Sequence, residues 1–403
     1  MAHETSFFDA DVVIVGGRCA GAATARLLAR SGLRVVVLDR ATFPSDTRST
    51  HALAPAGSLL LRQWGLLDDV LAARTPTART IGVQIGTFAG SFPVQEGWPG
   101  SMAPRRTVLD ALLVEAARAA GAEVREATTF RSVIRDHRGS VVGIIATDAG
   151  GASVEVRAPL VIGADGVGGP VAAALAAPEY AVSPSRISGV YAYYADVDVR
   201  QNELAFAGDH AALAFPTNDE LVCVAAVVRD DRLGELVAGG GDAALAVVAA
   251  ASPRLQELVV AGRRASRSFV FRPVDNVRRV PFGDGWALVG DAGLYRDPIT
   301  GQGIADAFVS AQLLADAVAV GLGGGARLDE ALAAYHLRRD DLLRDAYDVA
   351  CELSRYEWHD DSLLADFLRY REAVVATGRA VEEGLWGAQN PAITAPPALG
   401  ATG

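Results

Sequence analysis

The sequence is poor in the residue types on which several common kinds of site depend. Among 403 residues there are 3 cysteines and 6 histidines. The cysteines, Cys19, Cys223 and Cys351, are far apart and odd in number, which excludes a disulfide framework and a cysteine zinc site and fits a reducing compartment. We expect Cys19 to pack rather than react. With so few histidines and no convincing Ser/His/Asp set, neither a catalytic triad nor a metal site is expected.

Runs of positive charge and long apolar stretches are also missing. The formal net charge is −11 and no basic run with interleaved aromatics occurs, which argues against a nucleic-acid partner. No apolar run approaches the roughly 18 residues of a membrane helix, and no signal-like segment precedes Asp11. We therefore expect no membrane span and a cytoplasmic protein. Half of the residues are hydrophobic, enough for a large core divided between two or more lobes.

The stretch Asp11–Arg40, DVVIVGGRCAGAATARLLARSGLRVVVLDR, follows the pattern of strand, glycine turn, helix and strand. Apolar runs at residues 12–15 and 33–38 predict buried parallel strands, and residues 20–31 predict the helix between them. The N-terminus of this helix faces the turn, where backbone N–H groups and the helix dipole suit a pyrophosphate. A βαβ unit without a ligand would share these elements, but the glycines and the terminal acid favour a dinucleotide site.

Single positions in this stretch have separate expected roles. Gly16 permits the tight turn, Gly21 lets the helix pack closely on the sheet, and Asp39 is placed to accept hydrogen bonds from a ribose hydroxyl. Arg18 stands where the pattern G-x-G-x-x-G has its middle glycine. We expect its guanidinium to turn toward the pyrophosphate or toward the loop at residues 48–51. The cofactor-binding residues predicted here are Gly16, Gly17, Arg18, Gly21, Asp39 and Arg40.

The turn-rich segment ATFPSDTRSTH, residues 41–51, follows the ribose-binding strand directly. Arg48 and His51 are therefore expected over the nucleotide or at the mouth of its site. A solvated loop that caps the next helix is the alternative.

Two later stretches also run from a buried strand into a glycine turn. Residues 160–162 lead into GADG, which places Asp165 at a strand end, either on the cofactor, directly or through water, or in an Asx turn. Residues 286–289 lead into Asp291, a carboxylate suited to a polyol such as a ribityl chain. The following turn, PITGQG, opens a long helix whose dipole suits negative charge at the pyrimidine edge of a reduced flavin. This turn contributes Pro298, Gly301, Gln302, Gly303 and Ile304 to the prediction.

The region at residues 188–228 is rich in strand patterns and is not doubly wound. A sheet of this kind inserted into a nucleotide-binding fold commonly forms a substrate chamber. Four aromatic residues are candidates for its wall, and each could instead belong to the core: Tyr191, Tyr193, Phe206 and Phe215.

The three glycine stretches, together with FPSDTRSTH, PRRTVLDALL and FPTND, resemble the FAD-dependent monooxygenase superfamily typified by para-hydroxybenzoate hydroxylase, in a branch close to geranylgeranyl-reductase-like oxidoreductases. The resemblance covers nearly the whole chain and implies an α/β fold. Its parts would be an FAD-binding Rossmann-like βαβ domain of glutathione-reductase type, an inserted mixed β-sheet substrate domain and C-terminal helices. The implied division is 1–74, 101–180 and 281–325 for FAD, 75–100 and 181–280 for substrate, and 326–403 for the helices with a loose tail.

The resemblance also implies roles for single residues. Arg106 matches the arginine that reaches FAD from the start of its helix, Asp165 the acid of the DG motif, and Asp291 the ribityl acid. The hydroxylase DG motif continues with serine and arginine, and here Gly169 and Ala172 stand at those positions.

As function, the resemblance implies an FAD-dependent monooxygenase that hydroxylates a medium-sized, aromatic or polyketide-like metabolite through a flavin C4a-hydroperoxide formed with O₂. NAD(P)H would supply the electrons, or a flavin reductase would act as partner. The alternatives are an FAD-dependent reductase or dehydrogenase of carbon–carbon bonds and a non-catalytic flavin-binding protein. Because the flavin carries this chemistry, no side chain is assigned a certain catalytic role, and Pro298 and His51 are the candidates. The oligomeric state is left open.

Overall fold

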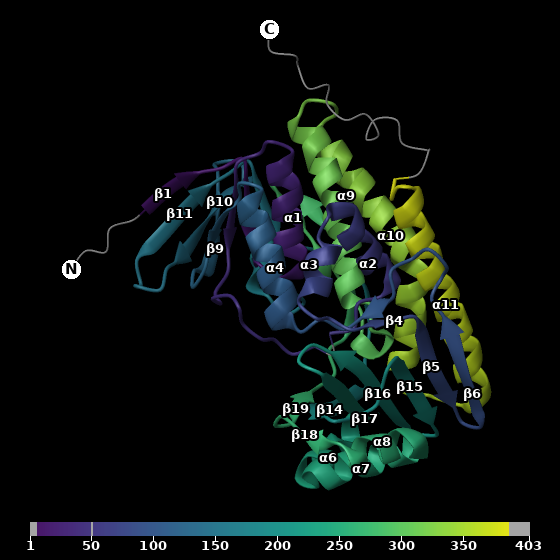
Figure 1. Cartoon of the computed structure of the whole chain (residues 1–403). Helices are drawn as coiled ribbons and strands as arrows, with labels where there is room; N and C mark the ends of the chain where they lie inside the picture. Colours follow the sequence, from purple (N-terminus) through teal and green to yellow (C-terminus); the bar gives the residue numbers. More distant parts are fainter. Residues whose placement is uncertain (1–5, 50, 387–403) are drawn as a thin grey trace.

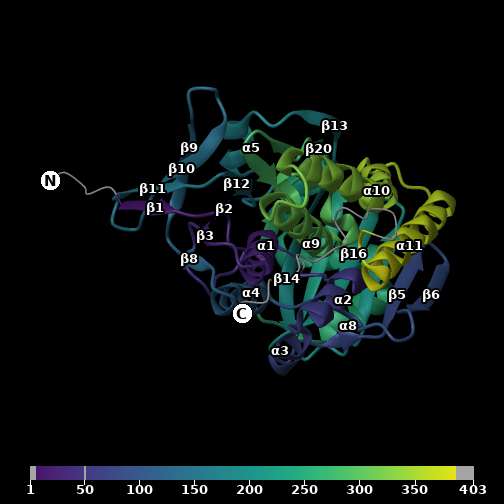
Figure 2. The same cartoon turned by 90° about the horizontal axis from the view of Figure 1, so that it is seen from above.

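The computed structural model describes residues 6–49 and 51–386. Figure 1 shows the predicted nucleotide-binding region, made of sheets and helices, above a second large sheet that has further helices on its lower side. Seen from above, in Figure 2, the long C-terminal helices lie together along one side of the molecule. The chain is thus the α/β protein that the sequence predicts, with several mixed sheets.

The nucleotide-binding region is built on a six-stranded sheet. All its strands are parallel except β21, which pairs antiparallel with β22 at one edge. In spatial order the strands are β21 (Phe282–Gly283), β22 (Trp286–Leu288), β12 (Leu160–Gly163), β2 (Val12–Val15), β3 (Val35–Leu38) and β8 (Glu123–Arg125). The three predicted stretches therefore supply the adjacent strands β22, β12, β2 and β3.

The two faces of this sheet are covered differently. Side chains alternate along a strand, so Val12 and Ile14 pack with helices while Val13 and Val15 pack with a second sheet. The helices are α1 (Cys19–Arg30), α2 (Pro55–Trp64), α4 (Arg106–Ala119), α9 (Gly303–Leu322) and α10 (Leu328–Ser354). The second sheet has the order β1 (Ser6–Asp9), β11 (Ser153–Arg157), β10 (Val141–Thr147) and β9 (Thr129–Arg135). The short helix α5 (Pro170–Leu175) packs beside it.

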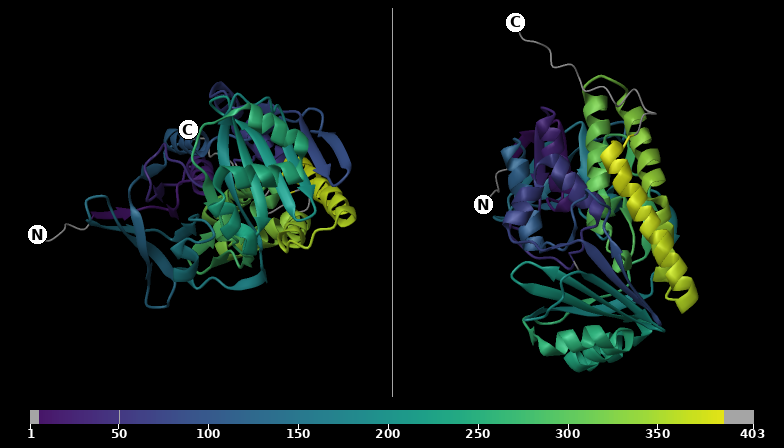
Figure 3. Two further views of the ribbon diagram at one scale, coloured as in Figure 1. Left: turned by 90° about the horizontal axis from the view of Figure 1, so that it is seen from below. Right: turned by 45° about the vertical axis from the view of Figure 1, so that its right-hand side comes forward.

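The lower region is an eight-stranded mixed sheet. Along its main path it runs β18 (Arg263–Arg264), β14 (Ile187–Ala195), β17 (Leu221–Arg229), β16 (His210–Thr217), β15 (Asn202–Ala207), β5 (Thr80–Ile85) and β6 (Phe88–Pro93), and β19 (Phe269–Phe271) also pairs with β14. One face is covered by α6 (Leu233–Ala238), α7 (Gly240–Ala251) and α8 (Pro253–Ala261), as Figure 3 shows. The other face looks toward the nucleotide-binding region and α11 (Asp360–Glu383).

Smaller elements complete the described chain. They are α3 (Leu67–Ala72), the pair β4 (Thr77–Ala78) and β7 (Ser101–Met102), the sheet β13 (Glu179–Ser183), β20 (Asn276–Arg279) and β23 (Leu294–Tyr295), and the turns η1 (Asp230–Arg232), η2 (Gly290–Ala292) and η3 (Pro298–Thr300).

Helix α9 departs from the expectation about membrane spans. By length and composition it could cross a membrane, with a mean hydropathy of 1.5 over its most apolar window. The search for uninterrupted apolar runs did not detect this helix, because Asp306, Gln312 and Asp316 interrupt its apolar residues. In the structure 72% of that window is buried inside the protein, where α9 packs against α1 and α10, so it has the environment of a core helix.

Candidate functional site

A cavity of 740 Å³ lies where the three glycine stretches meet the eight-stranded sheet. This volume is typical of sites for small molecules and cofactors. The cavity is bordered by the ends of β2, β3 and β12, where ligands bind in open α/β sheets. The predicted cofactor residues that line it are Gly16, Arg18, Asp39, Arg40, Arg48, Arg106, Asp165, Asp291, Pro298, Gly301, Gly303 and Ile304.

The turn after β2 can be built only with glycine at two positions. Gly16 has φ +106°, and a Cβ there would lie 2.4 Å from the carbonyl oxygen of Ala164. A Cβ at Gly21 would lie 1.7 Å from the carbonyl oxygen of Gly16, so α1 can approach the turn this closely only without a side chain. Gly17 and Gly21 therefore shape the cavity without lining it.

Asp39 holds the turn and borders the cavity at the same time. Its Oδ2 accepts a hydrogen bond from the backbone N–H of Gly17 at 2.7 Å, and its Oδ1 accepts one from that of Ala41 at 2.7 Å. A carboxylate has about four acceptor positions, so it can still accept a hydrogen bond from a hydroxyl in the cavity.

Arg18 belongs to a buried charged cluster around Asp110 of α4. Its Nη1 lies 2.6 Å from Asp110 Oδ2, and Arg106 Nε donates to Oδ1 at 3.0 Å. Arg18 Nη2 also donates to Ser45 Oγ at 3.1 Å. The Arg18 guanidinium thus contacts both Asp110 of α4 and Ser45, which lies in the loop just before residues 48–51. The thiol of Cys19 donates to Asp110 Oδ1, and burial raises its pKa well above the usual range.

We expect Arg18→Ala to weaken FAD binding about 10- to 100-fold, because it removes charge-assisted hydrogen bonds that fix the turn and the loop at Ser45. Titration of apoprotein with FAD, followed by flavin fluorescence, measures the affinity, and Arg18→Gly should behave in the same way. Arg34→Ala is the control, since Arg34 is two-thirds exposed and pairs with Asp11 away from the cavity. Unchanged affinity in both Arg18 variants would contradict the assigned role.

The second stretch turns back on itself at Asp165. Its Oδ2 accepts a hydrogen bond from the N–H of Val171 at 2.9 Å, whereas Oδ1 is buried with no partner among the described residues. Burial raises the pKa of Asp165. A Cβ at Gly169 would lie 2.1 Å from Asp165 Cγ. Glycine, which replaces the serine of the hydroxylase motif here, thus lets the carboxylate fold over residue 169.

The third stretch forms the far side of the cavity. Asp297 caps η3 by accepting a hydrogen bond from the N–H of Ile299 at 2.9 Å, and Ser185 Oγ donates to its other oxygen at 2.6 Å. Gly301 ends the turn with φ +64°, and α9 starts at Gly303 with its N-terminus at the cavity. Gln302 does not line the cavity; its amide donates to the hydroxyl of Tyr370 on α11 at 2.6 Å.

Asp291 lines the cavity at the end of β22. Burial and the neighbouring Asp306 carboxylate raise its pKa to about 7, although Arg106 and Arg296 act in the opposite direction. The folded apoprotein therefore keeps this carboxyl protonated at pH values where the unfolded chain ionises it.

A pH dependence of stability follows from Asp291. Between about pH 4 and 7 the carboxyl of Asp291 is ionised in the unfolded state and protonated in the folded state. Its contribution to the free energy of unfolding therefore falls as the pH rises. We expect the free energy of unfolding of wild-type apoprotein, relative to Asp291→Asn, to fall by roughly 1–3 kcal/mol from pH 4.5 to 8. Urea denaturation measures it, and Asp361→Asn, at an exposed aspartate, is the control. A pH-independent difference would contradict this assignment.

Beneath the turn lies a buried ion pair that the sequence did not reveal. Arg296 Nε and Nη2 donate to the two carboxylate oxygens of Asp306, each at 2.7 Å. The side chains are 2% and 6% exposed. This bidentate ion pair connects the residue after β23 to the N-terminal end of α9. It thereby fixes the direction of α9 relative to the cavity.

The wall of the cavity follows rows of residues across the eight-stranded sheet. Tyr191 and Leu213 share a row, since both pair with Ala225, and both line the cavity. The next row contains Tyr193 and Phe215, which both pair with Cys223 and do not line it. Phe206 lines a separate, smaller cavity. Of the four predicted wall residues, only Tyr191 borders the large cavity. Tyr193 and Phe215 lie in a row of the sheet that does not reach it, and Phe206 lies on β15, a strand that does not border it.

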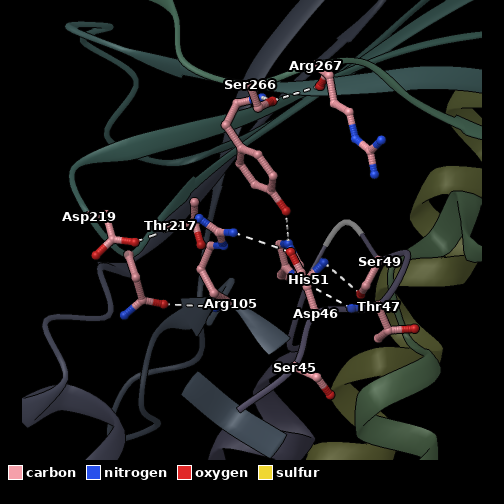
Figure 4. Close-up of polar contacts among 12 residues, drawn as sticks. Ser45, Asp46, Thr47, Ser49, His51, Arg105, Thr217, Asp219, Ser266 and Arg267 are labelled. Carbon is pink, nitrogen blue, oxygen red and sulfur yellow. Dashed lines mark hydrogen bonds and ion pairs between the residues drawn. The ribbon is translucent and has the colours of Figure 1, made fainter. Parts of the chain in front are cut away.

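Figure 4 shows the polar contacts of His51, Arg105 and Asp46. His51 is fully buried, has φ +64°, and its Nε2 contacts the Tyr193 hydroxyl. The guanidinium of Arg105 lies 4.5 Å from the Tyr193 ring centre, and its Nη2 lies 3.3 Å from Asp46. Burial lowers the pKa of His51 to about 3, so the imidazole is neutral. His51 thus contacts the sheet through Tyr193 and does not line the cavity.

Several lining residues were missed by the sequence reasoning. Leu213, Val227 and Phe271 come from strands, and Tyr295 and Arg296 precede the predicted turn. Strand alternation could have indicated Leu213, which lies two residues before Phe215 on the same face. Phe271 and Arg272 follow no local pattern, since only the pairing of β19 with β14 brings them to the cavity. Within residues 6–49 and 51–386, no group of three or more His, Cys, Asp or Glu side chains is arranged to hold a metal ion.

A cavity between a glycine turn, a DG turn and a helix N-terminus defines an FAD-binding oxidoreductase. Residues 9–350 match the protein family described as FAD binding domain, and the chain belongs to this family.

Characterised relatives include reductases and a hydroxylase. The menaquinone reductase of Mycobacterium tuberculosis is 33% identical over 40% of this chain and 39% of its own length. The digeranylgeranylglycerophospholipid reductase of Methanothrix thermoacetophila is 29% identical over 81% of this chain and 82% of its own. The aklavinone 12-hydroxylase of Streptomyces peucetius is 31% identical over 39% of this chain and 36% of its own. The matches to the first and the third thus span well under half of each relative.

Solved structures share the fold at low sequence identity. The flavin-dependent brominase Bmp2 is 22% identical, with a TM-score of 0.77 over 92% of this chain and 93% of its own. A probable FAD-dependent monooxygenase from Pseudomonas aeruginosa, pqsL, is also 22% identical, with a TM-score of 0.74 over 91% of this chain and 99% of its own.

Proposed function

We propose that this chain is an FAD-dependent monooxygenase that hydroxylates a medium-sized, aromatic or polyketide-like metabolite. The observation that carries the proposal is the continuity of the cavity, which extends from Gly16 past Asp291 and the turn before α9 to the wall formed by Tyr191, Leu213 and Phe271. A single space thus has a nucleotide-binding end and a largely apolar end.

The residues of the nucleotide end fit FAD. The turn at Gly16 and the N-terminus of α1 would hold the pyrophosphate, Asp39 the adenosine ribose, and Asp291 the ribityl chain. Arg40 and Arg48 line the cavity, and their side chains form no hydrogen bond or ion pair with the described residues, so they can neutralise a dianionic ligand. Gly301 and Gly303 leave room beside the pyrimidine edge, where the dipole of α9 favours negative charge.

When bound and reduced, FAD supplies the activation of O₂. The protein orients the substrate and excludes water. Tyr191 lines the cavity and stacks on Phe269, which does not line it, with ring centres 5.0 Å apart; this packing holds the Tyr191 ring in place as an aromatic wall for a planar substrate. None of the 403 residues is lysine, so no step can be relayed by an amine side chain. We propose NAD(P)H or a separate flavin reductase as the source of electrons.

The deciding experiment is turnover with and without oxygen. Purified holoprotein, reduced by NADH, NADPH or a flavin reductase, is incubated with a panel of aromatic and polyketide-like compounds. Oxygen uptake in proportion to hydroxylated product supports the proposal, and product formation without oxygen contradicts it.

A reduction of carbon–carbon double bonds is the second candidate, because a relative that matches over 81% of this chain is a digeranylgeranylglycerophospholipid reductase. Turnover of a prenyl compound without oxygen would establish it. A yellow protein whose flavin none of these donors reduces would instead indicate a non-catalytic flavin-binding protein.

A further inference from the structure

A second, small cavity lies between the eight-stranded sheet and the C-terminal helices. Its volume is 20 Å³, enough for one very small molecule. It is lined by Ile85 of β5, Phe206 of β15, Leu363 and Phe367 of α11, and Ile299 of η3. Its remaining lining residues are Leu204, Thr300, Leu353 and Tyr370.

The small cavity continues the wall of the large cavity along the same face of the sheet. Phe206 pairs with Ala211, which pairs with Val227 of the large cavity, so the three residues form one row from β15 to β17. Leu204 and Leu213 share the neighbouring row. Ile299 borders both cavities. A molecule in the small cavity would therefore contact the turn expected beside the flavin ring, and the Ile299 side chain lies between it and the large cavity.

The chemistry of the small cavity favours an apolar guest over water. A buried water typically makes two to four hydrogen bonds. The Tyr370 hydroxyl is already committed, because it donates to the carbonyl oxygen of Thr300 at 2.5 Å and accepts from Gln302 at 2.6 Å. Among the described residues that line the cavity, Thr300 Oγ1 is a single hydroxyl without a partner. The other lining side chains are hydrocarbon.

We infer that the small cavity binds dioxygen and supplies it to the flavin site past Ile299. This inference rests on the proposed monooxygenase function, which requires O₂ beside the reduced flavin. It adds a place where O₂ is concentrated, which is lined by Ile299 and Thr300 of the turn and by neither of the exposed arginines Arg40 and Arg48. An apolar cavity of this size selects a small neutral molecule by size and by its scarcity of hydrogen-bonding groups, since Thr300 alone among the described lining residues has an unpaired polar side-chain atom, its Oγ1.

Xenon tests the binding site without catalysis, because it occupies apolar cavities as a small neutral atom. Crystals of the holoprotein pressurised with xenon should show an electron-density peak enclosed by Phe206, Leu363 and Phe367. Leu363→Ala, which enlarges the cavity, should raise the xenon occupancy. An ordered water in the cavity, or its lack of xenon in both proteins, would overturn the inference.

Delivery to the flavin is tested by stopped-flow reoxidation of the dithionite-reduced holoprotein in buffers of known O₂ concentration. Leu363→Phe should lower the second-order rate constant about fivefold, because the added ring fills the cavity. Leu236→Phe on α6 is the matched control, a leucine equally buried on the opposite face of the sheet, and should change the rate less than about twofold.

A reoxidation rate for folded Leu363→Phe equal to that of the control would overturn the delivery route. If Leu363→Phe does not fold, Leu353→Met, which extends a more flexible side chain into the same cavity, replaces it. The proposed function fails separately: a wild-type protein that binds xenon and reoxidises rapidly, yet forms only hydrogen peroxide and no hydroxylated product, retains the oxygen site and loses the monooxygenase assignment.

Discussion

Gly21→Val is expected to give a protein that purifies without FAD and whose free energy of unfolding is lowered by more than about 3 kcal/mol. The valine Cβ would lie 1.7 Å from the carbonyl oxygen of Gly16 and 3.2 Å from the Ala164 side chain. The first of these contacts is with backbone, so α1 must move away from β2. The same movement displaces the N-terminus of α1 from the expected pyrophosphate position.

The control for this variant is Gly168→Ala, in the DG turn of the same cavity. A Cβ at Gly168 would meet nothing within 4 Å, so this substitution should leave stability unchanged within about 0.5 kcal/mol. Urea denaturation of the apoproteins and the flavin absorbance of the purified proteins give the two readouts. If Gly21→Val retained FAD and wild-type stability, the close approach of α1 to the glycine turn would be wrong.

Arg296→Met is expected to destabilise the protein by about 3–5 kcal/mol, because it leaves Asp306 buried without its cation. Asp306→Leu should cost a similar amount for the opposite reason. The double variant replaces the pair by apolar side chains and should lose much less than the sum of the single variants. Denaturation at pH 8, where an unpaired carboxyl gains least from protonation, measures the three values.

The matched control is the exposed pair formed by Arg200 and Asp198, whose side chains are 86% and 69% exposed. Arg200→Met should change the free energy of unfolding by less than about 1 kcal/mol. Additive losses in the Arg296 and Asp306 cycle would show that the two side chains do not act as a pair.

The sequence was informative wherever a site is built from consecutive residues. Each glycine stretch contains its own strand, turn and helix start, and parallel strands of one sheet end at the same edge, so Gly16, Asp165 and Asp291 could be placed together before the structure. The same local logic identified Asp39, whose position at a strand end is part of the pattern.

The cavity wall could not be predicted in the same way, because it depends on the register between strands. Tyr191 and Tyr193 have the same alternation and the same chemistry, yet Tyr191 lines the large cavity, whereas the hydroxyl of Tyr193 contacts His51 of the neighbouring loop and does not reach it. The small cavity is still further from local pattern, since β5, β15, η3, α10 and α11 all contribute to it. The pair of Arg296 and Asp306 was missed because a turn separates the two residues in the sequence, and nothing in the sequence indicates that the turn brings their side chains together.

The strand order of the six-stranded sheet has a consequence for biosynthesis. The adjacent strands β2, β12 and β22 begin at residues 12, 160 and 286. The strand that is synthesised first therefore pairs with strands that are synthesised much later. At translation rates of about 5–20 residues per second, roughly 15–60 seconds separate the emergence of the first glycine turn from that of the start of α9. During this interval the nascent nucleotide lobe has an open apolar edge, first beside β2 and, once β12 has emerged, beside β12 until β22 follows. Cells that overproduce this protein should therefore obtain more soluble material at slower synthesis and with ample FAD, which can capture the lobe once it closes.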